Sequence, residues 1–421
     1  MITNRGVPPA LPLAELDDAR ERTLLLAADL TGEQLSVPRL EIINPILWEL
    51  GHIAYFAEFW ILRGLLQCPP MISIADSLYD SAKVAHDERW SLPLPSRDDT
   101  RSFMQRELSE IHSQASALAQ SEDARYFYQL ALHHEDMHAE ALIYTRQTLS
   151  YRAPSFASRP APRAGALAGD VRIPGGRYCI GALPEDGFVF DNEKWAHEVE
   201  LKPFKIARAP VTNAEFTEFI EAGGYRKATL WSEEGWVWQQ AERAEHPVYW
   251  QSDCKTRRSF DRIIPLHEHE PVCNVNFHEA EAFCKWAGRR LPTEAEWEIA
   301  ATGGQRRRYP WSNDPPQAQT ANADGLYDGV CDVAAFEAGE SPSGCRQMIG
   351  NVWEWTASLF QPYPGFRIDP YKEYSEPWFG THRVLRGGAW TTRTRLISTR
   401  WRNFYRPYRR DIMTGFRTVK S

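Results

Sequence analysis

Apolar residues recur at intervals of three and four from Leu13 to about Leu149, and Gly and Pro are sparse inside these stretches. This period is that of amphipathic helices, each of which buries one face. The pattern predicts helices near residues 13–31, 44–66, 99–120 and 124–149. Four helices of this length favour a helical bundle.

Beyond this region the pattern changes twice. Residues 152–170 are rich in Pro, Ala, Gly and Arg, a composition typical of a linker. After about Val171 the expected strands are short, Gly and Pro are frequent, and Trp and Tyr are scattered. We therefore predict an α+β protein of two domains, with a helical bundle at 1–151, a linker at 152–170 and an irregular α+β domain at 171–421.

Helix starts are still recognisable in the second half. Thr212 with Glu215, and Thr293 with Glu296, each fit a capping box, in which the two side chains satisfy reciprocal backbone donors. We expect helices to begin at both threonines, and a third helix at roughly 278–287.

The composition narrows the class of protein. Of 421 residues 43% are hydrophobic and 25% charged, and the net charge of −8 comes without a long basic run, which argues against a nucleic-acid partner. The N-terminal segment lacks an apolar signal core, and no apolar run is long enough to span a bilayer. The seven Cys include no C-x-x-C pair. We expect free thiols, a cytoplasmic location and no membrane partner, and the sequence leaves one or two buried disulfides open as the alternative.

Three histidines form the clearest candidate chemistry. His134 and His138 lie four residues apart in HHEDMHAE (133–140), so they share the apolar face of the last predicted helix. His52 lies on the inward face of an earlier helix, in PILWELGHIAYF. Buried imidazoles need partners for both ring nitrogens, and one metal ion provides a partner for all three. We predict a metal site formed by His52, His134 and His138.

Other interpretations of these residues stay open. A single inward histidine is more often a satisfied core residue, and only the convergence of three favours a metal. Three neutral imidazoles suit zinc, iron or copper, and the spacing does not choose among them. His133 is offset from the ligand face, and Glu140 projects to a different side, so we expect neither to be a ligand.

Several motifs make the chain resemble a known family over nearly its whole length. The first half resembles a DinB-type bundle through its H-x3-H-x-E motif. The second half resembles the formylglycine-generating-enzyme fold, a variant of the C-type lectin fold. The matching stretches are PVTNAEF (210–216), VNFHEAEAFCKWAGRRLPTEAEWEIAA (275–301), IGNVWEWT (349–356), RVLRGGAW (383–390) and RNFYRPYRRDIMTGFR (402–417). This domain order is similar to that of the ergothioneine sulfoxide synthases and selenoneine synthases.

The resemblance implies an activity and a cofactor. It implies an O2-dependent oxidoreductase that uses Fe(II), held by His52, His134 and His138, to couple a sulfur or selenium donor to hercynine (trimethylated histidine). It also implies an active site between the two domains. Formylglycine-generating chemistry needs a Cys pair after the R-G-G segment, and RGGAWTTRTRLISTRWRN (386–403) contains no Cys.

Two segments bear on the chalcogen donor. Sulfoxide synthases that use γ-glutamylcysteine resemble one another in an R-x-x-R pair before S-L-P-L, where this chain has HDERWSLPL: Arg89 matches the second Arg, and His86 replaces the first. They also share R-N-W-D, where this chain has Asn403, Phe404 and Tyr405. One candidate cation and one candidate anion are thus lost, which favours a neutral selenosugar over a zwitterionic dipeptide.

Further residues are candidates for handling hercynine and protons. Phe404 offers an aromatic face to the trimethylammonium group, and Asn403 an amide to the carboxylate. Tyr363, in QPYPGF, is our candidate proton donor, although a Tyr in this setting is often only a packed turn residue.

Three other functions remain to be weighed against a selenoneine synthase. The first is an ergothioneine sulfoxide synthase that uses γ-glutamylcysteine or cysteine. The second is a zinc-dependent DinB-type thiol transferase, which would need no O2. The third is a lectin-like binding module in which the histidines are structural.

Overall fold

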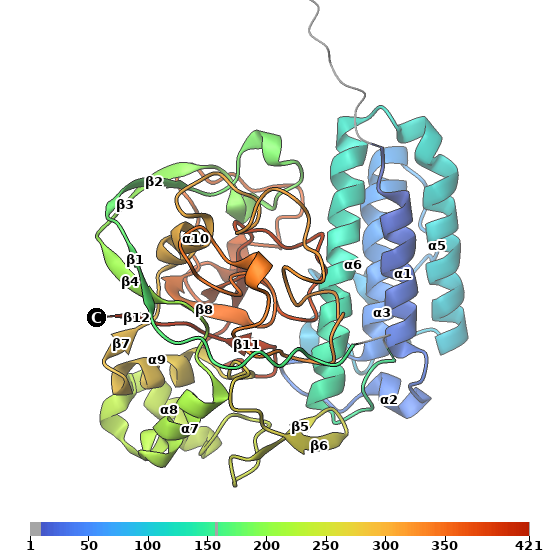
Figure 1. Cartoon of the computed structure of the whole chain (residues 1–421). Helices are drawn as coiled ribbons and strands as arrows, with labels where there is room; N and C mark the ends of the chain where they lie inside the picture. The colour runs from blue at the N-terminus through green and yellow to red at the C-terminus, as the bar shows by residue number, and fades with distance from the viewer. Residues whose placement is uncertain (1–9, 156–158, 421) are drawn as a thin grey trace, which may run out of the picture. The chain divides into compact units, whose positions relative to one another are not determined.

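The computed structural model describes residues 10–155 and 159–420 and divides the chain into two compact units. The first ends at Thr145, and the second begins at Arg146. Figure 1 shows a bundle of long helices in the N-terminal unit, and short strands with shorter helices and long loops in the C-terminal one.

The first unit contains the four long helices that the apolar period predicts. Its helices are α1 (Leu13–Ala27), α2 (Gly32–Ser36), α3 (Ile46–Ala57), a π-helix (Glu58–Leu65), α4 (Ala75–Tyr79), a 3-10 helix (His86–Glu88), α5 (Arg97–Leu118) and α6 (Glu122–Thr148), whose last three residues belong to the second unit. The first helix is shorter than expected, because Thr31 caps the separate helix α2. The predicted helix at 44–66 continues α3 into the π-helix, a change of winding that periodicity does not reveal.

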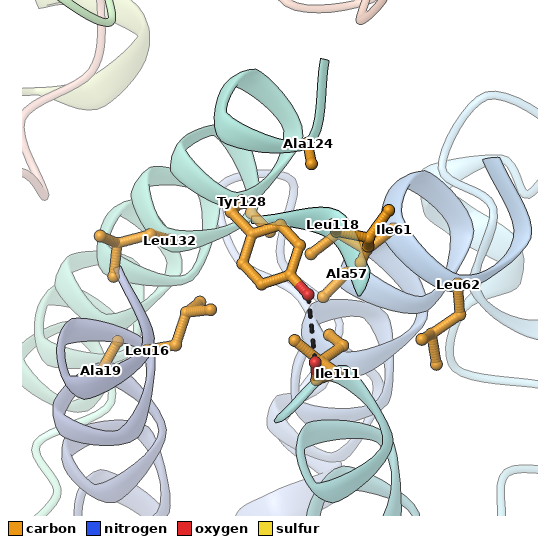
Figure 2. Close-up of a cluster of buried hydrophobic side chains, with 11 residues drawn as sticks. Leu16, Ala19, Ala57, Ile61, Leu62, Ile111, Leu118, Ala124, Tyr128 and Leu132 are labelled. Atoms are coloured by element: carbon orange, nitrogen blue, oxygen red, sulfur yellow. Dashed lines mark hydrogen bonds between the residues drawn. The ribbon is translucent and has the colours of Figure 1, made fainter. Parts of the chain in front are cut away.

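A cluster of buried apolar side chains holds the bundle together (Figure 2). It comprises Leu16, Ala19, Ala57, Ile61, Leu62, Ile111, Leu118, Ala124, Tyr128, Ala131 and Leu132. The Tyr128 hydroxyl donates to the carbonyl of Ile111 at 3.1 Å, so this polar atom is satisfied inside the apolar cluster.

A buried ion cluster also links three of these helices. Arg20 on α1 donates to Glu135 on α6 at 2.9 Å and to Glu107 on α5 at 3.0 Å. All three side chains are at most 5% exposed. Removing Arg20 would leave two carboxylates without a cation in the interior, so the cluster also restricts how the helices pair.

The second unit is built on two small sheets and two hairpins. The first sheet has the order β1 (Asp170–Ile173), β4 (Phe204–Ala207), β12 (Val419–Lys420), β7 (Arg289–Arg290). The second has the order β10 (Asn403–Tyr405), β9 (Arg383–Arg386), β8 (Trp353–Leu359), β11 (Thr414–Gly415). The hairpins pair β2 (Gly176–Ile180) with β3 (His197–Leu201), and β5 (Thr256–Ser259) with β6 (Arg262–Pro265).

Four α-helices accompany these strands in the described part of the second unit, and the predicted caps are confirmed. They are α7 (Asn213–Glu221), α8 (Glu233–Glu242), α9 (Phe277–Trp286) and α10 (Glu294–Thr302). Capping boxes at Thr212 and Thr293 open α7 and α10. A third box, Asn276 with Glu279, opens α9 one residue before the predicted start.

The described part of the segment predicted as a linker, 152–170, belongs to the second unit and is hydrogen-bonded to its other residues. The backbone N–H groups of Ala164 and Gly165 both donate to Asp332 at 2.9 Å, and Arg163 donates to Glu270 at 2.7 Å. Hydrogen bonds from side chains of the second unit thus order a stretch whose composition cannot form a core of its own.

Two expectations from the composition can be compared with these residues. All seven cysteines are free. Within residues 10–155 and 159–420, none of the helices combines the length and the apolar character that a membrane crossing requires.

Candidate metal centre

The three predicted histidines converge inside the first unit. His52 lies on α3, His134 and His138 lie on α6, and one ligand nitrogen of each lies within 4.8 Å of the others. The ring centroid of His52 is 5.0 Å from that of His134 and 5.1 Å from that of His138. His133, the neighbour that we did not expect to be a ligand, lies outside this group.

A backbone carbonyl orients His52. Its Nδ1 lies 2.7 Å from the carbonyl oxygen of Tyr79. Because a carbonyl oxygen only accepts hydrogen bonds, Nδ1 carries the hydrogen, and Nε2 keeps the lone pair that a metal requires. A glycine in α3 permits this contact. A Cβ on Gly51 would lie 2.3 Å from the Tyr79 ring, so only glycine lets Tyr79, at the end of α4, approach α3 this closely.

Aromatic side chains hold the imidazoles in place and exclude water. Trp48 stacks on His52 with ring centroids 4.7 Å apart, and its indole N–H donates to the Leu78 carbonyl at 2.7 Å. Phe56 stacks on His134 at 3.6 Å.

Burial favours the neutral form of His52 and of His134. Burial, with the neighbouring His138 as a further cause, lowers the pKa of both His52 and His134 well below 6.5. Neutral imidazole is the form that binds a metal ion. The tautomer of His52, the burial and the mutual distances therefore fit a divalent metal with three nitrogen ligands.

Arg89 and His86, the candidates in the first unit for binding the chalcogen donor, have different surroundings. The Cζ of Arg89 lies 4.0 Å above the ring of Trp48, which also stacks on His52, so Arg89 lies close to the histidine group. His86 instead has Nε2 2.8 Å from the Ile43 carbonyl, and must donate to it. That ring N–H is already used by the backbone.

The segment Asn403–Tyr405 forms strand β10, which pairs with β9. Side chains of a strand alternate between faces, so Asn403 and Tyr405 share one face while Phe404 lies on the other. Phe404 stacks on Phe360 at 4.0 Å and meets Tyr374 edge-on at 5.7 Å. The three residues that sequence comparison groups into one candidate pocket therefore do not present one continuous surface.

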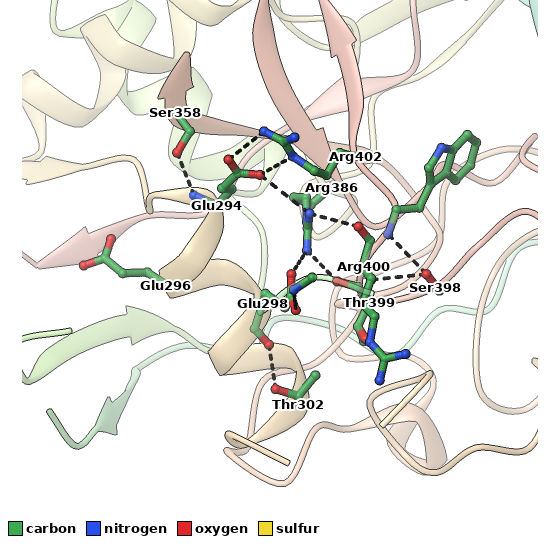
Figure 3. Close-up of polar contacts among 12 residues, drawn as sticks. Glu294, Glu296, Glu298, Thr302, Ser358, Arg386, Ser398, Thr399, Arg400 and Arg402 are labelled. Carbon is green, nitrogen blue, oxygen red and sulfur yellow. Dashed lines mark hydrogen bonds and ion pairs between the residues drawn. The ribbon is translucent and has the colours of Figure 1, made fainter. Parts of the chain in front are cut away.

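Tyr363 lies in the interior of the second unit and is 7% exposed. Its hydroxyl donates to Glu294 at 3.3 Å, and the guanidinium of Arg402 lies 3.9 Å above its ring. Glu294 and Arg402 belong to the network of buried ion pairs in Figure 3. Burial, with Glu294 as a further cause, raises the pKa of the Tyr363 hydroxyl. Its role as a proton donor stays a prediction, and its contacts are those of a packing residue.

Sequence reasoning missed two residues beside the histidine group, Asn44 and Glu49. Glu49 is 2% exposed, and its carboxylate lies 3.6 Å from His138. The available signal was a single acidic residue inside the otherwise apolar run of α3, one helical turn before His52.

Comparison with protein families follows the same division of the chain. Residues 15–142 match the DinB superfamily, and residues 156–421 match the sulfatase-modifying factor enzyme 1-like domain. Fold and site thus define a class of protein in which a DinB bundle with a three-histidine centre precedes a sulfatase-modifying-factor domain.

Full-length relatives narrow the class to one family. The chain is 38% identical to the hercynine oxygenase of Mycolicibacterium smegmatis over 421 residues, which cover 96% of this chain and 97% of that protein. It is 38% identical to the hercynine oxygenase of Mycobacterium tuberculosis over 417 residues, which cover 95% and 96%. The chain belongs to the hercynine oxygenase family and is an oxidoreductase.

A more distant likeness covers about half of the chain. The formylglycine-generating enzyme of Streptomyces coelicolor is 31% identical over 272 residues, which cover 56% of this chain and 84% of that enzyme.

Proposed function

We propose that this protein is an Fe(II)- and O2-dependent enzyme that couples a selenium or sulfur donor to C2 of the imidazole of hercynine. The observation that carries the proposal is the convergence of His52, His134 and His138 in a chain whose full-length relatives are named hercynine oxygenases. Iron is favoured over zinc because an oxygenase needs a redox-active metal, and zinc has no redox chemistry.

The proposed reaction balances without a further reductant. Hercynine gives up the hydrogen on C2, the thiol or selenol gives up its hydrogen, and a carbon–chalcogen bond forms. One oxygen atom of O2 remains on the chalcogen as a sulfoxide or selenoxide, and the other leaves as water. The two substrates therefore supply all four electrons that reduce O2.

The residues of the site have separate roles in this proposal. The three imidazoles hold the metal, and the carbonyl of Tyr79 keeps His52 in the ligand tautomer. Trp48 and Phe56 cover the imidazole faces and exclude water. When bound, iron(II) supplies the redox chemistry that lets O2 react with a thiol or selenol.

We assign the hercynine contacts to the second unit. The ring of Phe404, which is stacked on Phe360, is proposed as a face for the trimethylammonium group, and the Asn403 amide as a partner for the carboxylate. Because these side chains lie on opposite faces of β10, each assignment needs its own variant, Phe404→Leu and Asn403→Ala. A selective increase in the KM for hercynine supports an assignment, and an unchanged KM refutes it.

For the donor we favour a neutral selenosugar. Tyr405 offers a hydroxyl and a flat ring where an Asp would attract a substrate ammonium, and His86 donates to Ile43 rather than offering a fixed positive charge. The alternative donor is γ-glutamylcysteine or cysteine, and a specific observation favours it: the cation Arg89 lies beside the histidine group and suits a carboxylate.

One experiment tests the metal, the reaction and the donor. The protein is loaded anaerobically with iron(II), and O2 is admitted with hercynine and one donor: a selenosugar, its thiosugar analogue, γ-glutamylcysteine or cysteine. The masses of the coupled products are measured, with His138→Ala as the inactive control. Preference for the selenosugar supports the full proposal, and preference for γ-glutamylcysteine supports the family activity but refutes the donor assignment.

Two further outcomes distinguish the rival functions. Thiol transfer by the zinc-loaded protein without O2 indicates a DinB-type thiol transferase. Purification without stoichiometric metal, together with no effect of His138→Ala on function, indicates a binding module.

A further inference from the structure

A buried carboxylate lies behind one of the proposed metal ligands. Glu49 lies on α3, one helical turn before His52, and is 2% exposed. Its Oε1 is 3.6 Å from Nδ1 of His138 on α6. Nδ1 of His138 and Oε2 of Glu49 are both buried and have no hydrogen-bond partner among the residues that the structure describes. The Glu49 carboxylate, one oxygen of which lacks a hydrogen bond, thus faces the unpartnered Nδ1 of His138 across the two helices.

Glu49 is held in this position by a polar chain. Arg89 donates to Oδ1 of Asn44 at 2.6 Å, and Nδ2 of Asn44 donates to Oε1 of Glu49 at 3.0 Å. The orientation of the Asn44 amide is determined by its partners, because a guanidinium can only donate and a carboxylate can only accept. Asn44 therefore connects the Glu49 carboxylate behind His138 to Arg89, one of the candidate residues for binding the chalcogen donor.

We propose that Glu49 is the positioning residue of His138, and that it accepts a hydrogen bond from Nδ1–H when the imidazole binds a metal through Nε2. The inference rests on the proposed three-histidine metal site. The separation of 3.6 Å needs to close by less than ~1 Å to reach hydrogen-bond range, a tightening common when a site is filled. His52 already has the matching arrangement, with Nδ1 directed at the Tyr79 carbonyl.

The charges of the site support this role. Three neutral imidazoles leave the two positive charges of a divalent metal uncompensated. A carboxylate behind one ligand fixes its tautomer, raises its basicity and places a negative charge close to the metal. A carboxylate buried without such a partner would only lose hydration energy.

The test uses the full chain and measures iron affinity rather than turnover. Iron(II) dissociation constants are determined anaerobically by competition with a chromogenic chelator for wild type, Glu49→Gln, Glu58→Gln and His138→Ala. We expect Glu49→Gln to weaken iron binding by about 10- to 100-fold. Glu58→Gln is the matched control, since Glu58 is also a buried acid but accepts from the backbone N–H of Met71. It should stay within twofold of wild type.

A second measurement examines His138 directly in the metal-free protein. In ¹⁵N-histidine-labelled samples, the Nδ1 and Nε2 chemical shifts report the tautomer of each ring. We expect His138 to hold its proton on Nδ1 in wild type and Glu58→Gln, and to move toward a mixture of tautomers in Glu49→Gln. Unchanged His138 shifts together with unchanged iron affinity overturn the inference.

The outcomes separate this inference from the metal site on which it rests. If wild type binds no stoichiometric iron, or His138→Ala binds it equally well, the metal site itself is refuted. If Glu49→Gln does not fold, as judged by circular dichroism, iron binding by Asn44→Ala is measured instead. This variant keeps the carboxylate and removes the amide that links it to Arg89. Weaker iron binding by Asn44→Ala supports the role of Glu49, and binding equal to wild type overturns it.

Discussion

Replacing Arg402 by methionine removes a fully buried cation of the second unit. The guanidinium donates to Glu294 through Nε at 2.8 Å and Nη2 at 3.0 Å (Figure 3). It also donates to the carbonyls of Asn192 at 2.7 Å and Gln361 at 3.0 Å. Its side chain is 0% exposed, whereas that of Glu294 is 13% exposed. Arg402 directly precedes strand β10, so these bonds also fix the position at which the strand begins, at Asn403.

The expected loss in the free energy of unfolding comes from Glu294, which stays in the interior when Arg402 is removed. Arg402→Met leaves Glu294 without its bidentate partner, and two backbone carbonyls without a donor. Removing one partner of a buried ion pair costs ~3–5 kcal/mol. For a unit of this size that corresponds to a fall in melting temperature of roughly 6 to 20 °C.

Differential scanning calorimetry of the full chain measures this effect. The control is Arg290→Met, which breaks the pair with Glu296 on the same helix α10. That arginine is 43% exposed, and a solvent-exposed pair contributes at most ~1 kcal/mol. In the double variant Arg402→Met/Glu294→Gln we expect a loss smaller than the sum of the single losses, since no unpaired charge remains. A fall in melting temperature for Arg402→Met that is no larger than the fall for Arg290→Met would refute this reasoning.

Three further predictions concern the bundle core, pH and the donor. Ile61→Ala empties a position that is 0% exposed in the bundle core and should cost ~2–5 kcal/mol in thermal unfolding; a loss under ~1 kcal/mol contradicts the packing. Burial, aided by Arg383, lowers the pKa of His278 from 6.5 to about 4, so the unfolded chain takes up the proton first as pH falls. Between pH 6.5 and 4 the free energy of unfolding of wild type should therefore fall by up to ~3 kcal/mol more than that of His278→Gln. Equal falls for the two proteins, measured by denaturant titration at each pH, would exclude this. Tyr405→Asp should raise kcat/KM for γ-glutamylcysteine relative to kcat/KM for the selenosugar by roughly tenfold or more. An unchanged ratio of the two values would show that Tyr405 does not select the donor.

The features that the sequence alone predicts correctly are those set by neighbours along the chain. The apolar period identifies the long helices, and Thr212 and Thr293 mark helix starts because a capping box involves only four consecutive residues. The spacing of His134 and His138 places both on one helical face for the same reason. The added turn at α2 and the π-helix after Ala57 escape this reasoning, since neither interrupts the apolar period.

Contacts between elements are decided only by the tertiary structure. Glu49 and His138 are 89 positions apart and meet because α3 packs beside α6, while Gly51 lets the turn at Tyr79 reach His52. The same applies to Tyr363, since its place in the sequence does not reveal that the guanidinium of Arg402 lies above its ring. Local patterns specify which face of an element is apolar. They do not specify which side chain of a distant element comes within hydrogen-bond range, because that depends on the path of the chain and on packing throughout the unit.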